Sequence, residues 1–169
     1  VASPVLIGNV VGMITLGTPQ PELPVRERDN SLFMLIDGVL AAAVIAAAAA
    51  GSAADQYIMT SYYRDELAGL PEMGLVGRQL WSQSGLNPDD MDMAILYDHF
   101  TPYTLLQLEE LGFCGRGEAK DFVREPGALE VGGRLPLNTH GGQLGEAYIH
   151  GMNGIAEGVR QIRGTSVNQ

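Results

Sequence analysis

Short apolar runs separated by glycine and proline fill the first fifty residues. Residues 5–16 have room for one or two strands, and residues 31–36 for another short apolar element. The run 39–50 is apolar on every side, so periodicity does not distinguish a buried helix from a buried strand that becomes a helix. It is shorter than the roughly 18 residues that span a bilayer and lacks a basic flank, so we expect neither a membrane anchor nor a secretory signal.

From about residue 57 the pattern becomes more regular. Apolar residues recur at helical spacing over 72–84, and Gly85 follows, typical of a helix that ends in the left-handed conformation. Residues 91–96 predict a strand, and a second helix is expected over 102–111. Strands alternating with helices indicate the α/β class.

Local sequence signals mark the ends of the second helix, and apolar spacing predicts a third. Thr101 is expected as the N-cap of the second helix, Pro102 as its first helical residue and Gly112 as its end. The third helix is expected over 146–163, with one apolar face made of Ile149, Met152, Ile155, Ala156, Val159 and Ile162. The same segment is rich in small residues (Gly145, Ala147, Gly151, Gly154 and Gly158), a feature tolerated where another backbone approaches closely.

Charge and cysteine content exclude several classes of protein. The chain has 169 residues, enough for one domain or one and a fraction, and 46% of them are hydrophobic, enough for a core. Lys and Arg number 10 against 20 Asp and Glu, a net charge of -10 that argues against a nucleic-acid partner. Its single cysteine excludes a disulfide framework and a Cys-rich zinc site, and fits a reducing compartment, so we expect a cytoplasmic protein.

The first group with candidate chemistry is Tyr-Asp-His-Phe at residues 97–100, where the predicted strand ends. Side chains at the carboxyl end of such strands face ligand crevices. His99 suits proton exchange near neutral pH, and Tyr97 can donate to an oxyanion or exchange a proton. The alternative is that Asp98 and His99 only decorate a helix start while Tyr97 and Phe100 pack.

A second candidate group is the glycine-rich segment 138–151. Its Gly141-Gly142 turn, if it enters a helix, presents backbone N–H groups suited to a thioester oxyanion, a phosphate or a carboxylate. No nucleotide-binding glycine motif is present. The spacing of His140, Glu146 and His150 matches no closed zinc site, so we expect no metal.

Two further features remain open to a structural interpretation. Cys114 lies in the segment Gly-Phe-Cys-Gly-Arg-Gly at 112–117, where glycine and arginine flank it. A small apolar residue at a helix end is nevertheless favoured over a nucleophile, because no local histidine signature accompanies it. Tyr63 belongs to the cluster 62–65, which either lines a pocket or packs at the surface.

Residues from about 57 to 169 resemble the C-terminal half of the thiolase superfamily, in the lipid-transfer-protein branch related to the sterol carrier protein thiolases. Residues 97–100 stand where those thiolases have His-Asp-Cys-Phe or Asn-Glu-Ala-Phe, and residues 137–142 stand at their Asn-Pro-Ser-Gly-Gly segment. Their Gly-His-Pro-x-Gly motif aligns with residues 147–151, so Tyr148 takes the position of the catalytic histidine.

The resemblance implies a thiolase-like layered α/β/α fold. Residues 57–169 would form the C-terminal domain. Residues 1–56 would be the tail of the N-terminal domain or a linker, because Asp37-Gly38 and the apolar run after it resemble the strand that closes that domain.

The resemblance also implies an activity. An ordinary thiolase is disfavoured because Tyr148 replaces histidine and no Cys-Gly-Gly-Gly motif is present near the end of the sequence. The pattern is similar to the lipid-transfer-protein aldolases of bacterial steroid side-chain degradation, which cleave a β-hydroxyacyl-CoA to a ketone and a short acyl-CoA such as propionyl-CoA. Tyr148 and Tyr97 are then the candidate proton-transfer pair, and His99 or the Gly141-Gly142 backbone holds the oxyanion.

The same resemblance suggests the remaining binding residues and partners. His140, Gly141, Gly142 and Tyr63 are the candidate substrate-binding residues, and no cofactor is expected because acyl-CoA is the substrate. The expected partners are a second copy of the chain, an OB-fold acyl-CoA-binding protein, or both. The alternatives are a degenerate thiolase-type acyl-CoA acyltransferase and a non-catalytic module that binds acyl-CoA or a partner.

Overall fold

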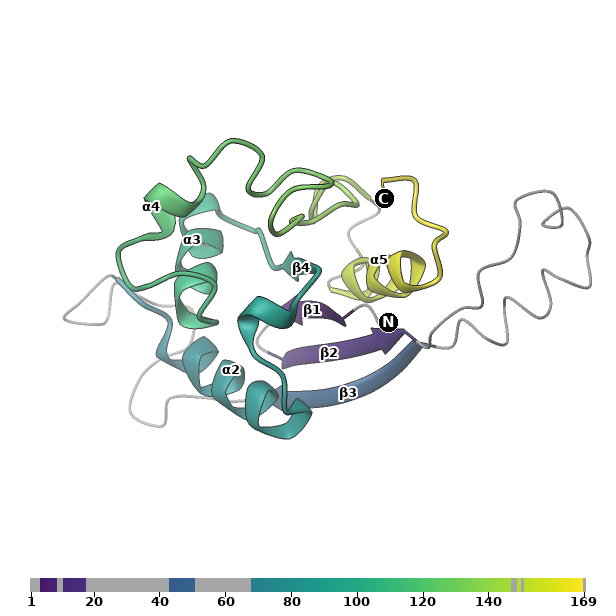
Figure 1. Cartoon of the computed structure of the whole chain (residues 1–169), viewed down its shortest axis with the longest axis horizontal. Coiled ribbons are helices and arrows are strands. Elements are labelled where there is room, and N and C mark those ends of the chain that lie inside the picture. The colour runs from purple at the N-terminus through teal and green to yellow at the C-terminus, as the bar shows by residue number, and fades with distance from the viewer. Residues whose placement is uncertain are drawn as a thin grey trace, which may run out of the picture.

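The computed structural model describes residues 4–8, 11–17, 43–50, 68–146, 149 and 151–168. Its described strands form one sheet in the order β3-β2-β1-β4 (Figure 1). Their bounds are β1 Pro4–Gly8, β2 Val11–Gly17, β3 Ala43–Ala50 and β4 Met93–Leu96. Strand β2 runs antiparallel to both of its neighbours, whereas β1 and β4 are parallel, with Val5 opposite Met93.

Residues 43–50 of the apolar run, for which the sequence left helix and strand open, form a strand. In β3, Ala47 and Ala49 are buried, whereas Ala48 and Ala50 are exposed, so alternate residues face opposite sides. Alanine is small and apolar on both faces, which is why the sequence showed no period. Residues 39–42 and the element expected at 31–36 lie outside the described residues.

Helices cover both faces of the sheet. Their bounds are α2 Pro71–Ser84, α3 Thr101–Glu110, α4 Ala119–Phe122 and α5 Met152–Ile162, with a 3-10 turn at Pro88–Asp90. Helix α2 contacts β2 and β3 and packs against α3, whereas α5 lies against β1, β2 and β4 (Figure 1). None of the helices in the described ranges is long and apolar enough to cross a membrane.

Strand β4 divides the core between these two layers. Ala94 and Leu96 belong to the larger cluster, which contains Leu80 of α2 and Leu108 of α3. The alternate residues, Met93 and Ile95, pack against Ile155 and Ile162 of α5. Because neighbouring strand residues face opposite sides of a sheet, this alternation confirms the expected layered α/β/α arrangement.

The helix ends predicted from glycine are confirmed, but one cap is wrong. Gly85 (φ 71°) and Gly112 (φ 87°) both have left-handed backbones just beyond α2 and α3. Phe100, not Thr101, occupies the N-cap position of α3, and no side chain caps this end. Thr101 is already helical and Pro102 follows it within the first turn, because the extended backbone continues one residue past His99.

The last helix begins later than predicted. Residues 143–146 form turns, Gly151 is the N-cap with φ 88°, and α5 starts at Met152 rather than at residue 146. The expected apolar face is also partly wrong, since Ile149 and Met152 are mostly exposed. The most deeply buried residues of α5 are instead Asn153, Gly154, Glu157 and Gly158. The expected domain boundary near residue 56 lies outside the described residues and stays a prediction.

Candidate active site

Tyr97, Asp98 and His99 follow directly on β4, at its carboxyl end. The Tyr97 carbonyl accepts a hydrogen bond from Gln107 Nε2 of α3 at 2.8 Å, which fixes the backbone where the strand ends. The His99 ring centroid lies 4.7 Å from that of Tyr97 and 4.7 Å from that of Tyr103. The structure therefore brings two of the candidate residues, Tyr97 and His99, into direct ring contact. His99 Nδ1 is buried and has no hydrogen-bond partner among the described residues.

Asn138 places the glycine-rich turn beside these residues. Its backbone N–H donates to the Ala94 carbonyl at 3.0 Å. Its side chain accepts from the Leu96 N–H at 2.8 Å and donates to the Leu96 carbonyl at 3.0 Å. The Asn138 side-chain amide thus pairs with the Leu96 backbone, at the end of β4, in the way that the backbone of a neighbouring strand would. Its positive φ of 50°, which Asn tolerates better than most residues, turns the chain away from the sheet.

Asp98 holds the far end of the same turn. Its carboxylate accepts a hydrogen bond from the Gln143 N–H at 2.9 Å. Gly142 has φ 75°, and a side chain there would collide with the Asp98 carboxylate. Asp98 therefore anchors the 138–143 turn rather than merely decorating the start of α3.

The turn engages one of the two glycine N–H groups that were candidates for an oxyanion, and also the N–H group that follows them. Gly141 N–H donates to the Asn138 carbonyl at 2.8 Å, and Gln143 N–H is held by Asp98. The turn also does not enter α5 directly, so the expected support from a helix N-terminus is absent at Gly141-Gly142. Of the two oxyanion candidates, His99 has a ring nitrogen that no described residue engages.

His140 lies between the two fixed ends of the turn. Both of its ring nitrogens are buried and have no hydrogen-bond partner in the described ranges. The preceding residue, Thr139, donates its hydroxyl proton to the buried Glu157 carboxylate of α5 at 2.6 Å. The turn thus presents one polar ring whose nitrogens no described residue engages.

Two candidates cannot be placed in this geometry. Tyr148 and Tyr63 lie outside the described residues, as does His150, so the roles of both tyrosines stay predictions. Within the part of the chain that the structure describes, no group of three or more His, Cys, Asp or Glu side chains could hold a metal ion.

Cys114 is half-buried beyond the end of α3 and lies in a hollow separate from the turn. Burial, reinforced by the carboxylates of Glu109 and Glu118, raises the pKa of its thiol to about 11, despite the opposing effect of Arg134. A thiol with this pKa is almost entirely protonated near neutral pH and is a poor nucleophile.

Sequence reasoning missed the three residues that hold the turn. Asn138 and Asp98 act through pairings with residues about 45 positions away, so no local pattern predicts them. One sequence signal points to Glu157. It is an acidic residue in the last predicted helix, whose many small residues indicate close packing rather than a solvent-exposed face.

Comparison with known proteins identifies the family of the chain. The thiolase C-terminal domain-like family matches residues 51–169. The 17-hydroxy-3-oxo-4-pregnene-20-carboxyl-CoA lyase of Mycobacterium tuberculosis is 80% identical over 118 residues, which are 70% of this chain and 30% of the lyase. The steroid side-chain-cleaving aldolase of Thermomonospora curvata is 76% identical over 119 residues, again 70% of this chain and 30% of the relative.

A solved structure gives the same result. The Ltp2-ChsH2(DUF35) aldolase superposes with a TM-score of 0.66 at 75% sequence identity, over 70% of this chain and 31% of that one. The chain thus spans about 30% of the length of the relatives that it matches. Because the family match extends over more than two thirds of its residues, the chain belongs to the thiolase C-terminal domain-like family.

Proposed function

We propose that this chain supplies part of an active site that cleaves a β-hydroxyacyl-CoA by a retro-aldol step. The observation that carries the proposal is the contact between Tyr97 and His99 at the end of β4, beside the 138–143 turn. The names of the similar lyase and aldolase support a steroid side-chain acyl-CoA as the substrate class. The products are a ketone and a short acyl-CoA such as propionyl-CoA.

The reaction needs a base, an oxyanion donor and an acid. The base removes the proton of the β-hydroxyl, the bond between the α- and β-carbons breaks, and its electron pair moves into the thioester as an enolate. The acid then returns a proton to the α-carbon, so atoms and charge balance without a cofactor or a second acyl group. Tyr97 and Tyr148 form the proton-transfer pair in this proposal. The His99 ring, whose Nδ1 no described residue engages, stabilises the enolate oxygen.

We further propose that the site works in an assembly. Its partners are a second copy of the chain, an OB-fold acyl-CoA-binding protein, or both, and its compartment is the cytoplasm. The name of the Ltp2-ChsH2(DUF35) aldolase, which joins two components, supports this proposal.

Product stoichiometry tests the proposed reaction. The assembled complex is incubated with a 17-hydroxy steroid acyl-CoA, and the ketone, the short acyl-CoA and free CoA are measured. A retro-aldol reaction yields ketone and short acyl-CoA in equal amounts and needs no free CoA. A requirement for free CoA or a second acyl-CoA would favour an acyltransferase, and binding without turnover would favour a binding module.

A further inference from the structure

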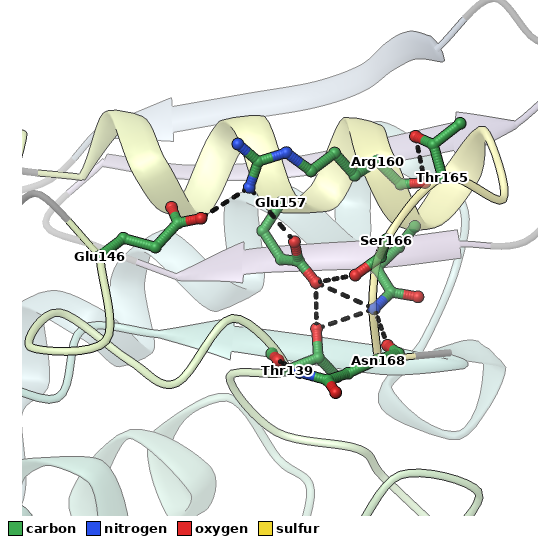
Figure 2. Close-up of polar contacts among 8 residues, drawn as sticks. Thr139, Glu146, Glu157, Arg160, Thr165, Ser166 and Asn168 are labelled. Carbon is green, nitrogen blue, oxygen red and sulfur yellow. Dashed lines mark hydrogen bonds and ion pairs between the residues drawn. The ribbon is translucent and has the colours of Figure 1, made fainter.

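The Glu157 carboxylate is buried beneath α5 and collects three hydrogen bonds on one oxygen. Its Oε1 accepts from Thr139 Oγ1 at 2.6 Å, from Ser166 Oγ at 2.7 Å and from Gln161 Nε2 at 3.0 Å (Figure 2). Its second oxygen lies 3.6 Å from Arg160 Nη1. Glu157 itself is 2% exposed, so these groups replace the water that an acidic side chain ordinarily contacts.

Glu157 is held in its ionised form. Burial alone would raise its pKa, but the hydrogen bonds from Thr139, Ser166 and Gln161, together with the nearby His140, lower it below the usual range. An ionised carboxylate only accepts hydrogen bonds, so the hydroxyl proton of Thr139 must point toward Glu157. This fixes the direction of that hydrogen bond.

Thr139 is therefore fixed through both its side chain and its backbone. Its hydroxyl oxygen also accepts from Gln161 Nε2 at 2.9 Å, and its carbonyl accepts from Asn168 Nδ2 at 2.7 Å (Figure 2). Asn138, the residue before it, is paired with β4. The backbone that leads into His140, the next residue, therefore cannot shift without breaking these contacts.

We propose that Glu157 is a positioning residue of the site, which acts through Thr139 to fix the His140 ring for contact with the acyl-CoA substrate. The proposal rests on the proposed function, because it assigns His140 to substrate binding. A buried carboxylate is a poor way to stabilise a fold, since apolar packing of similar volume serves as well or better. A requirement to orient Thr139 and His140 accounts for a charge at this position.

Enzyme kinetics on the assembled complex tests the proposal with three variants. Thr139→Val removes the hydroxyl at nearly constant shape, Thr139→Ser retains it, and the control Glu125→Gln removes an exposed carboxylate that is paired with Arg134 and makes no contact with the Glu157 network. Thr139→Val should raise the KM for the β-hydroxyacyl-CoA about 10-fold, the loss expected for one hydrogen bond to a charged group, and leave kcat within about twofold. Thr139→Ser should restore the KM, and Glu125→Gln should leave it near the wild-type value.

A second readout does not depend on turnover. With ¹³C-labelled histidine, the His140 ring resonances should shift in Thr139→Val and in Glu157→Gln, and stay unchanged in Glu125→Gln. If the complex shows no lyase activity, the proposed function fails while the resonances still test the link from Glu157 to His140. Unchanged His140 resonances in Thr139→Val, or an unchanged KM in an active Thr139→Val enzyme, would overturn the proposal.

Discussion

The Asp98 carboxylate occupies the space that a side chain at Gly142 would fill. Asp98 comes from the end of β4 and Gly142 from the glycine-rich turn, so this contact sets how closely the two candidate segments approach each other. The hydrogen bond from the Gln143 N–H to Asp98 fixes the same approach. Glycine at position 142 is thus required both by its positive φ and by its neighbour.

A comparison of Gly142→Ala with Gly127→Ala should separate the cost of a side chain at positive φ from the cost of its contact with Asp98. Both glycines have φ 75°, but a side chain at Gly127 would meet nothing within 4 Å. Gly127→Ala should therefore cost only the strain of a left-handed backbone, about 1–2 kcal/mol. Gly142→Ala should cost about 1–3 kcal/mol more because of overpacking against Asp98. Denaturant unfolding measures both, and equal losses would show that Asp98 does not restrict the turn.

Gly154→Leu tests the close contact between α5 and β4. A Cβ at Gly154 would lie 3.0 Å from Ile95 Cγ2, so a larger side chain must push the helix away from the strand. We expect a loss of about 1–3 kcal/mol in the free energy of unfolding. The same substitution in an Ile95→Ala background should cost less, because the contacting methyl group is gone. Equal costs in the two backgrounds would place the strain elsewhere.

Glu157→Gln should reduce stability in a pH-dependent way. The pKa of Glu157 is lowered in the folded chain, so its ionised form contributes stability above about pH 4.3, the ordinary value for glutamate, and loses it as pH falls through the folded pKa. The difference in unfolding free energy between wild type and Glu157→Gln should therefore be largest near pH 7 and shrink below about pH 4.3.

The control for this titration is Glu125→Gln, which removes an exposed carboxylate paired with Arg134. Surface pairs of this kind contribute little, so its effect should be small and nearly flat with pH. A Glu157→Gln difference that grows on acidification would contradict the assignment of Glu157 as an ionised, hydrogen-bonded group.

Cys114 should react slowly with iodoacetamide. With a thiol pKa of about 11, the thiolate at pH 7 is about 100-fold or more scarcer than for a free cysteine with a pKa of about 8.5. The alkylation rate, followed by mass spectrometry, should rise steadily toward pH 11. Rapid labelling at pH 7 would show an activated thiol and would reopen the acyltransferase interpretation.

Elements bounded by local signals were predictable from the sequence. Pro71 and Gly85 bracket α2, Gly112 follows α3, and the apolar residues before Tyr97 form β4, because caps and breakers act within one turn of the chain. Tyr97 and His99 both follow a predicted strand, and the structure places their rings in contact.

Features fixed by distant contacts were not predictable. The apolar spacing continues through Ile149 and predicts a helix from residue 146, but α5 begins only after Gly151, whose backbone is left-handed. The buried Glu157 is compatible with the fold only because Thr139 and Ser166 supply hydrogen bonds from outside its helix. No local pattern identifies Thr139 and Ser166 as the partners of Glu157.

The retro-aldol account is tested most directly by the turnover of Tyr148→Phe and Tyr97→Phe in the assembled complex. Each variant keeps the aromatic ring and removes the hydroxyl that the account uses for proton transfer. With a β-hydroxyacyl-CoA as substrate, each should lower kcat by about 10²–10⁴-fold, the usual contribution of one positioned acid or base, whereas Cys114→Ala should leave kcat nearly unchanged. Near-normal activity in Tyr148→Phe, or loss of activity in a folded Cys114→Ala variant, would contradict the account.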